Sequence, residues 1–220
     1  MNHFKKEKWQ EIDNTLIPIT DASGSTYLIT HVNPNFSVEY HPTSDAATIL
    51  LQNEHGNMLG WRLKNAQNST PIPVRKILRK RFSHSQYVDL PHPFRSEVIY
   101  KSILPGADLR CSIPTIPLKN TIVFENRAAI CLITCILITP DVTPLRNTNG
   151  VIDLITCTGD IAYTILQPYM QDSNSLNHLD WIACELQQTQ ERDIWQLTFS
   201  PNDSWLDNAQ FPVTINTCCI

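Results

Sequence analysis

The stretch that decides the fold lies near the C-terminus, where WQLTFS (195–200), PNDSWL (201–206) and FPVTI (211–215) follow one another. Trp195, Leu197 and Phe199 alternate with polar residues, a two-residue period that is typical of a strand with one buried face. The segment 201–204 has the composition of a turn, and the alternation resumes at 211–215. We therefore expect two strands joined as a closing β-hairpin.

The composition of the whole chain favours the same structural class. Its 220 residues are 42% hydrophobic and include 15 prolines. This apolar content is sufficient for a sizeable core, and prolines spread through the chain argue against a helical bundle. We predict an all-β protein with an antiparallel β-sandwich-like architecture, formed as one large β-domain or as two packed β-units.

Charge and hydropathy exclude several partners. The net charge is −4 and the pI is about 5.9, so nucleic acid is not an expected partner. The first residues, MNHFKKEKW, lack an apolar export segment, and the longest apolar run, 128–138, is too short for a membrane span. We expect a cytoplasmic location if the chain is expressed as given, or a missing export segment if it works outside the cell.

Alternation elsewhere in the sequence predicts further strands. Residues 27–31 and 36–40 predict a first hairpin, and 46–52 and 58–63 predict a second around Gly56, which is suited to a positive φ. Segment 179–186 fits either a strand or a short helix. Residues 151–157 and 161–165 predict a third hairpin by their Gly-containing turn. Other predicted strands are 98–103, 109–113, 121–125 and 129–139 (buried on both faces).

The alternation is lost between residues 65 and 97, where prolines and polar residues dominate. Such a segment is typical of a long loop or linker. We therefore divide the chain into an N-terminal β-unit (1–65), a proline-rich basic connector (66–97), a C-terminal β-unit (98–216) and a tail (217–220).

The connector contains a cluster of cations that is a candidate for contact with an anionic surface. On a helix, Val74, Ile77, Leu78 and Phe82 would lie opposite these cations and form a basic amphipathic segment. The alternative, which we favour, is a solvated connector whose apolar residues cover the adjoining sheet. The cations are Arg75, Lys76, Arg79, Lys80 and Arg81.

The seven cysteines form no Cys-x-x-Cys pair and lie at no zinc-finger spacing from a histidine, so we expect no metal site. Most are expected to be small buried apolar residues. A disulfide from Cys131 or Cys135 to Cys111 or Cys157 is the alternative. The cysteines are Cys111, Cys131, Cys135, Cys157, Cys184, Cys218 and Cys219.

No motif for catalysis or cofactor binding is present in the sequence. No nucleophile lies in a recognisable signature, and neither a glycine-rich phosphate loop nor a His-Glu-x-x-His helix occurs. The histidines are expected to be solvent-facing or locally bonded. Asp108 in the LPGAD turn (104–108) and Asp203 beside Trp205 are interpreted as turn carboxylates rather than cation or sugar ligands. We predict no enzyme, no catalytic residue and no cofactor.

The order of several phrases resembles a known family. KWQEIDNTL (8–16), VIYKSILPGADL (98–109) and LKNTIV (118–123) are followed by NGVI (149–152), PYMQDS (168–173), PNDSWL (201–206) and FPVTI (211–215). This series is similar to the β-rich region that precedes the tyrosine/aspartate repeats of wall-associated Rhs-repeat proteins of Gram-positive bacteria. Each phrase alone is a weak pattern, and the joint order carries the resemblance.

The resemblance implies an extracellular or cell-wall β-module with no catalytic residues. It also implies a place beside a repeat shell that displays or delivers C-terminal effector domains. Two positions depart from the family pattern, because Asn120 stands in place of Glu and NTCCI (216–220) in place of Asp-Pro. We therefore expect an isolated or truncated module.

Two functions remain in view. The preferred one is a non-catalytic structural or interaction β-module that packs against an Rhs-type shell or another protein domain. The alternative is a carbohydrate-binding β-sandwich for cell-wall polysaccharide, which needs exposed tryptophans. Alternation places Trp61 and Trp195 inside, which favours the first function. The full set is Trp9, Trp61, Trp181, Trp195 and Trp205.

Overall fold

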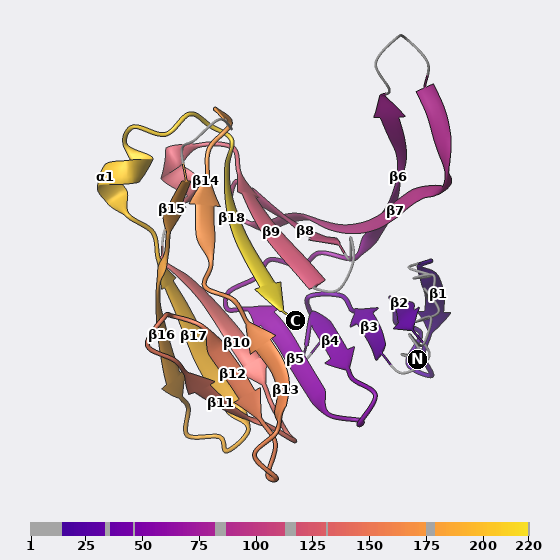
Figure 1. Ribbon diagram of the computed structural model, residues 1–220, viewed down its shortest axis with the longest axis vertical. Coiled ribbons are helices and arrows are strands. Elements are labelled where there is room, and N and C mark those ends of the chain that lie inside the picture. The colour runs from indigo at the N-terminus through magenta and orange to yellow at the C-terminus, as the bar shows by residue number, and fades with distance from the viewer. Residues whose placement is uncertain are drawn as a thin grey trace, which may run out of the picture.

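The computed structural model describes residues 15–33, 36–45, 47–81, 87–112, 118–130, 132–174 and 179–219, with the backbone alone for 31–33, 75–81 and 87–96. These residues form two antiparallel sheets, so the predicted all-β, sandwich-like class is confirmed (Figure 1). Inward-facing side chains of both sheets share one hydrophobic core.

The first sheet has eight strands and contains most of the N-terminal part of the chain. Its spatial order joins early strands to late ones, because β5 pairs with β10. In that order the strands are β1 (Ile17–Thr20), β2 (Thr26–Asn33), β3 (Phe36–Tyr40), β4 (Ile49–Gln52), β5 (Met58–Leu63), β10 (Ile133–Ile138), β17 (Ile194–Ser200) and β16 (Ala183–Gln188).

The second sheet has ten strands. Eight form a continuous path, and β14 (Tyr169–Gln171) and β15 (Leu179–Trp181) join it where β14 pairs with β18. The path runs β11 (Thr143–Arg146), β12 (Ile152–Ile155), β13 (Ile161–Ile165), β18 (Val213–Cys219), β9 (Leu118–Phe124), β8 (Ala107–Ser112), β7 (Tyr87–Leu104) and β6 (Ile72–Arg81).

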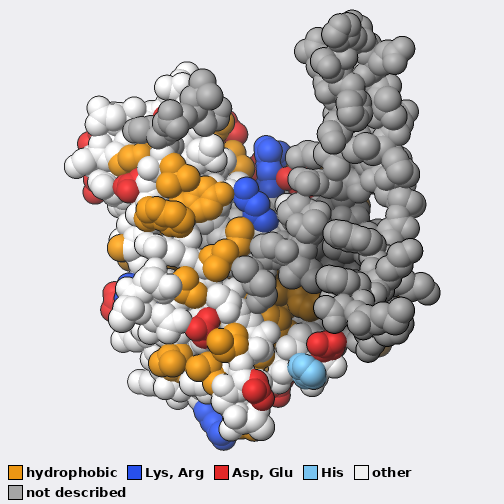
Figure 2. Space-filling view, in the orientation of Figure 1, with side chains coloured by type: hydrophobic (Ala, Val, Ile, Leu, Met, Phe, Trp, Pro, Cys, Tyr) orange, Lys and Arg blue, Asp and Glu red, His pale blue; other side chains and the backbone are white. Residues whose placement is uncertain are grey.

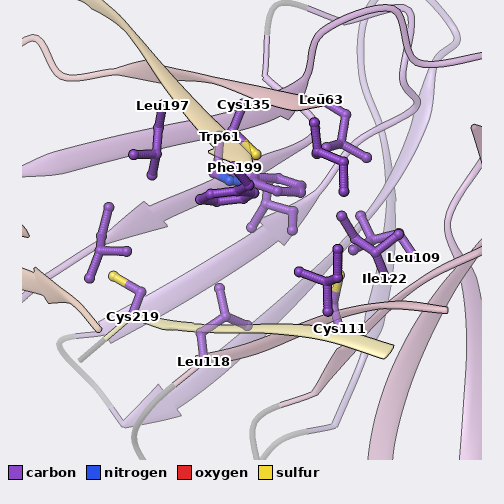
Figure 3. Packing of buried hydrophobic residues seen from close by; sticks show 14 of the residues in the cluster. Trp61, Leu63, Leu109, Cys111, Leu118, Ile122, Cys135, Leu197, Phe199 and Cys219 are labelled. Carbon is purple, nitrogen blue, oxygen red and sulfur yellow. The ribbon is translucent and has the colours of Figure 1, made fainter. Parts of the chain in front are cut away.

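Side-chain alternation explains how the two sheets pack. On β8, Ala107, Leu109 and Cys111 are buried and alternate with half-buried polar residues, which lie on the outer face. Figure 3 shows Leu109 and Cys111 on one side of the core and Trp61 and Phe199 on the other. At about 25 cal/mol per Å² of apolar surface, this shared core is the main term that stabilises the fold.

A buried tyrosine ties the two sheets together. The Tyr100 hydroxyl, on β7, donates hydrogen bonds to the carbonyl oxygens of His41 at 2.9 Å and Thr48 at 3.1 Å, beside the first sheet. Burial, followed by neighbouring charges, raises the pKa of Tyr100 well above its usual value, so the hydroxyl remains a donor. A polar bond thus fixes the register of one sheet on the other.

Three predicted hairpins are confirmed. They are β2–β3, β4–β5 and β12–β13. The turn of the second contains Gly56 at φ +78°, as its sequence predicts, and that of the third contains Gly159 at φ +91°. Segment 179–186 is extended and forms β15 and β16, which are separated only by the buried residue Ile182. Because β15 belongs to one sheet and β16 to the other, this stretch crosses between the sheets.

The predicted closing hairpin is wrong. Both strands exist, as β17 and β18, but β17 pairs with β10 and β16, whereas β18 pairs with β9, β13 and β14. The one-turn helix α1 (Asp203–Leu206) is capped at its N-terminus by Asn202, whose side chain accepts a hydrogen bond from the Trp205 N–H. The connection carries the chain from one sheet to the other instead of turning it back.

The long loop expected between residues 65 and 97 is also wrong. β6 and the first half of β7 occupy most of this segment and pair with each other, and in Figure 1 their ends extend away from the two sheets. Pro73 lies on β6, the edge strand of the sheet, where a missing N–H is tolerated. The division into units 1–65 and 98–216 stays a prediction, and the β5–β10 pairing links strands from both.

The strand predicted at 129–139 is shorter in the structure. Arg127–Ala129 forms the 3-10 helix η1, capped by the Asn126 side chain, and β10 begins at Ile133. Cys135, Ile136 and Leu137 are all buried, in agreement with the prediction that both faces of this strand are covered.

Candidate functional site

The described part of the chain does not gather the groups needed for metal chemistry. Among these residues, no three His, Cys, Asp or Glu side chains converge in a way that could hold a metal ion. In the same residues, no helix is long and apolar enough to cross a membrane. The remaining candidates for a functional site are individual polar groups and the two outer sheet faces.

The cysteines lie mostly in the core, as expected. Cys111, Cys135, Cys184 and Cys219 are buried, Cys157 is exposed, and none of the six described cysteines forms a disulfide. Cys131 lies outside the described residues, so the disulfide alternative is not tested for it. Burial raises the pKa of Cys184 and Cys219 to about 12, so these thiols are protonated at neutral pH and are poor nucleophiles.

One histidine has a structured environment. The His41 ring stacks on Tyr27 with centroids 4.5 Å apart, its Nε2 lies 2.8 Å from a Glu39 oxygen, and its Nδ1 lies 3.4 Å from an Asp45 oxygen. Both ring nitrogens therefore face carboxylates rather than a hydroxyl or a thiol. This arrangement orients the ring and fits the predicted local bonding.

The two carboxylates singled out from the sequence serve the fold. Asp108 accepts hydrogen bonds from the Ser102 N–H and the Lys101 ammonium. Partial burial raises its pKa, but these hydrogen bonds outweigh that effect and hold the pKa below its usual value. Asp203 pairs with Arg127 at 2.7 Å, and Trp205 packs half-buried against the core. Neither carboxylate has the surroundings of a ligand site.

A groove of about 550 Å³ lies on the outer face of the eight-stranded sheet. Its floor contains a cross-strand row in which Arg62 of β5, Ile136 of β10, Gln196 of β17 and Gln187 of β16 stand opposite one another. The buried Arg62 Nε has no hydrogen-bond partner among the described residues. The groove therefore offers amide groups, the Arg62 guanidinium and the Glu191 carboxylate around the apolar side chain of Ile136, immediately beside the edge strand β16.

The edge strands differ in their capacity to pair with another chain. Proline interrupts three of them, at Pro18 in β1, Pro73 in β6 and Pro144 in β11. β16 has the sequence ACELQQ, which contains no proline and no lysine or arginine, and among the described strands it pairs with β17 alone. Proline and cations are common devices that block edge pairing, and so is a very short edge strand, such as the three-residue β15. Among the described edge strands, β16 is therefore the longest that lacks these protections.

The outer face of the ten-stranded sheet contains an aromatic pair. Trp181 on β15 is 57% exposed and stands opposite Tyr169 on β14, with ring centroids 5.8 Å apart at an angle of 70°. The prediction that Trp61 lies inside is confirmed, and Trp195 is half-buried against the core. Trp9 lies outside the described residues. Sequence reasoning missed the exposure of Trp181, because a three-residue strand gives too little alternation to assign a face.

The predicted anionic-surface residues lie on β6, so the helical interpretation of this segment is wrong. The side chains of Arg75, Lys76, Arg79, Lys80 and Arg81 are outside the described part of the structure, and their contact with an anionic surface stays a prediction.

No family model, no curated protein and no solved structure matches this chain.

Proposed function

We propose that this protein is a non-catalytic interaction module that binds a neighbouring β-rich domain by strand addition at β16. The observation that supports this most directly is the contrast between β16, which has six residues and no proline, lysine or arginine, and the proline-containing edges β1, β6 and β11. An exposed edge presents unpaired N–H and C=O groups, and a partner strand satisfies them by extending the ladder.

The groove beside β16 supplies the specificity of this contact. Main-chain hydrogen bonds give affinity in strand addition, whereas pockets for alternate side chains select the partner. A strand added beyond β16 would place every second side chain on the face that contains Gln187 and the Arg62 groove. The amide groups and the Arg62 guanidinium favour polar partner side chains that accept hydrogen bonds, whereas Glu191 in the same lining disfavours strongly acidic ones.

The resemblance to the region that precedes the repeats of wall-associated Rhs proteins supports a choice of partner. In this proposal the partner is the repeat shell, itself built from strands, and the place of action is the cell surface. Protonated buried thiols and the carboxylate-bound His41 agree with a role without catalysis.

The test is to mix the purified chain with a purified wall-type repeat shell and measure complex formation by sedimentation velocity. The informative variant is Gln188→Pro. The Thr189 N–H bonds back to Ile194, so by the alternation of an antiparallel ladder the Gln188 N–H points to the free edge. Proline at position 188 has no N–H to donate to the partner strand, and the loss of this hydrogen bond should weaken the complex by about tenfold.

The matched control is Gln188→Ala, which keeps the N–H and removes the side chain. It should bind like the unchanged protein if main-chain pairing drives the contact. Equal binding by both variants, or no complex with the unchanged protein, would refute strand addition at β16.

A further inference from the structure

We infer that the outer face of the ten-stranded sheet binds an acidic polysaccharide along one cross-strand row. The row consists of residues that stand directly opposite one another on five neighbouring strands: Trp181, Tyr169, Asn216, Thr121 and Arg110. The inference goes beyond the proposed function, since the row shares no residue with β16 and either proposal can fail while the other holds.

Register and burial together place the row on one face. Directly opposed residues in antiparallel strands point to the same side of the sheet. The next residues along the strands, Met170, Ile215, Ile122 and Leu109, are at most 2% exposed and belong to the core. Trp181, Tyr169, Thr121 and Arg110 therefore point outward and are exposed or half-buried, whereas Asn216 between them is 2% exposed and serves to orient its neighbours. With strands about 4.8 Å apart, the row extends for roughly 19 Å, a length that suits several linked sugars rather than one.

The aromatic end of the row fits the apolar face of a sugar ring. Trp181 and Tyr169 are adjacent, and their ring planes differ by 70°, so each can contact a different unit of a chain that twists. An indole with 57% of its surface exposed is costly to leave in water and is typical of a binding surface. Figure 2 shows hydrophobic side chains gathered over β14 and β15 on this face, with Lys and Arg side chains farther across the sheet.

The middle of the row is polar and held in place. Thr121 donates to the Asn216 Oδ1 at 3.0 Å, and the Asn216 Nδ2 donates to the Thr214 hydroxyl at 3.1 Å. Thr214 in turn donates to the Gln171 carbonyl oxygen. The Thr121 oxygen keeps lone pairs that can accept from sugar hydroxyls, and the network fixes its direction before a ligand arrives.

The far end of the row provides the charge. The buried Nε of Arg110 has no hydrogen-bond partner among the described residues. Asp108 lies on the same strand face and interacts electrostatically with Arg110, but its oxygens accept hydrogen bonds from Lys101 and Ser102. Lys119 is another cation on this face, opposite Cys218. The guanidinium therefore complements a carboxylate, which it can bind through two parallel N–H groups.

The experiment titrates oligomers of polygalacturonate into the full chain by calorimetry, with the fully methyl-esterified oligomers as the neutral counterpart. Hyaluronate and alginate oligomers test other acidic sugars, poly(dT) tests nucleic acid, and phosphate alone tests a small anion. We expect an acidic oligosaccharide to bind about tenfold more tightly than its neutral counterpart, since one charge-assisted contact is lost on esterification.

Variants assign the binding to the row. Trp181→Ala should weaken acidic and neutral oligomers alike by about tenfold or more, and Trp181→Tyr should restore most of the affinity. Arg110→Gln should remove only the preference for the acidic form, and Arg110→Lys should keep it. The controls are Leu145→Ala, an exposed apolar residue on β11, and Lys64→Gln on the first sheet, which should change nothing.

Three results would overturn the inference. They are no binding of any acidic oligosaccharide in the panel, equal binding by Trp181→Ala and the unchanged chain, and binding of poly(dT) or phosphate that exceeds that of every sugar. Circular dichroism and a thermal melt of each variant separate loss of the site from loss of the fold.

Discussion

The bond that ties the two sheets through Tyr100 leads to a quantitative prediction about stability. Tyr100→Phe removes only the hydroxyl and leaves the ring, which is fully buried, in place. Packing is therefore nearly unchanged, and the whole effect on the free energy of unfolding comes from the two hydrogen bonds to the His41 and Thr48 carbonyl oxygens.

The loss in the free energy of unfolding depends on which of the two carbonyl oxygens keeps another hydrogen-bond donor after the substitution. The Thr48 carbonyl still accepts a hydrogen bond from the His41 N–H at 2.8 Å, so removing the Tyr100 hydroxyl from this oxygen costs little stability. The His41 carbonyl loses the Tyr100 hydroxyl in a partly buried position. A net hydrogen bond together with one weakened acceptor is worth about 2 kcal/mol. For a chain of this size, that corresponds to a melting temperature lower by roughly 4–8 °C.

The assay is urea unfolding followed by circular dichroism, with the slope of the transition compared between variants. The midpoint should fall while the slope stays the same, because the surface exposed on unfolding does not change. Tyr163→Phe is the matched control. Its hydroxyl donates to the Asn57 carbonyl at 2.7 Å, which also accepts the Asn53 N–H, so we expect a smaller loss of about 1 kcal/mol. An unchanged midpoint for Tyr100→Phe would refute the role of this hydroxyl as a tie between the sheets.

Two further predictions concern backbone and thiols. Gly106→Ala should lower the free energy of unfolding by about 2–3 kcal/mol, because φ is +71° and the new Cβ would lie 2.8 Å from that of Ala129. Gly159→Ala is the control: its new Cβ meets no atom within 4 Å, so the same urea assay should show a loss of only about 1 kcal/mol. Cys157 should react with a thiol reagent at neutral pH in the folded protein, and Cys184 should not. Since burial raises the pKa of Cys184 to about 12, its contribution to stability is complete below the usual thiol pKa of about 9 and is lost as pH rises from there towards 12. Cys184→Ala should remove that part of the alkaline loss, and an unchanged pH profile would contradict it.

Local pattern predicted where strands occur better than which strands pair. The alternation at 27–31 and 36–40 encodes two strands and a short turn, so proximity in sequence was sufficient to pair β2 with β3. The same alternation predicted β17 and β18, but it does not specify which strand each one pairs with. In the structure the two strands lie in different sheets, β17 beside β10 and β18 beside β9. Partner choice depends on the inner faces of distant strands, which a local window does not contain.

The candidate site was still harder to foresee. Trp181 lies on a strand of three residues, and Arg110 is separated from it by many residues in the sequence. The members of the row come together only because β15, β14, β18, β9 and β8 pair side by side in this order. The prolines at 71 and 73 wrongly predicted a loop, since proline on an edge strand is compatible with pairing on its other side.

The central position of β18 has a consequence for biosynthesis. β9 pairs with β8 on one side and needs β18 on the other, yet β18 leaves the ribosome long after β9. At a synthesis rate of roughly 5–20 residues per second, one edge of β9 stays unpaired for several seconds until β18 is made. A chaperone that shields the lone flank of β9 during this interval would therefore raise the yield of native protein more than one that acts after translation.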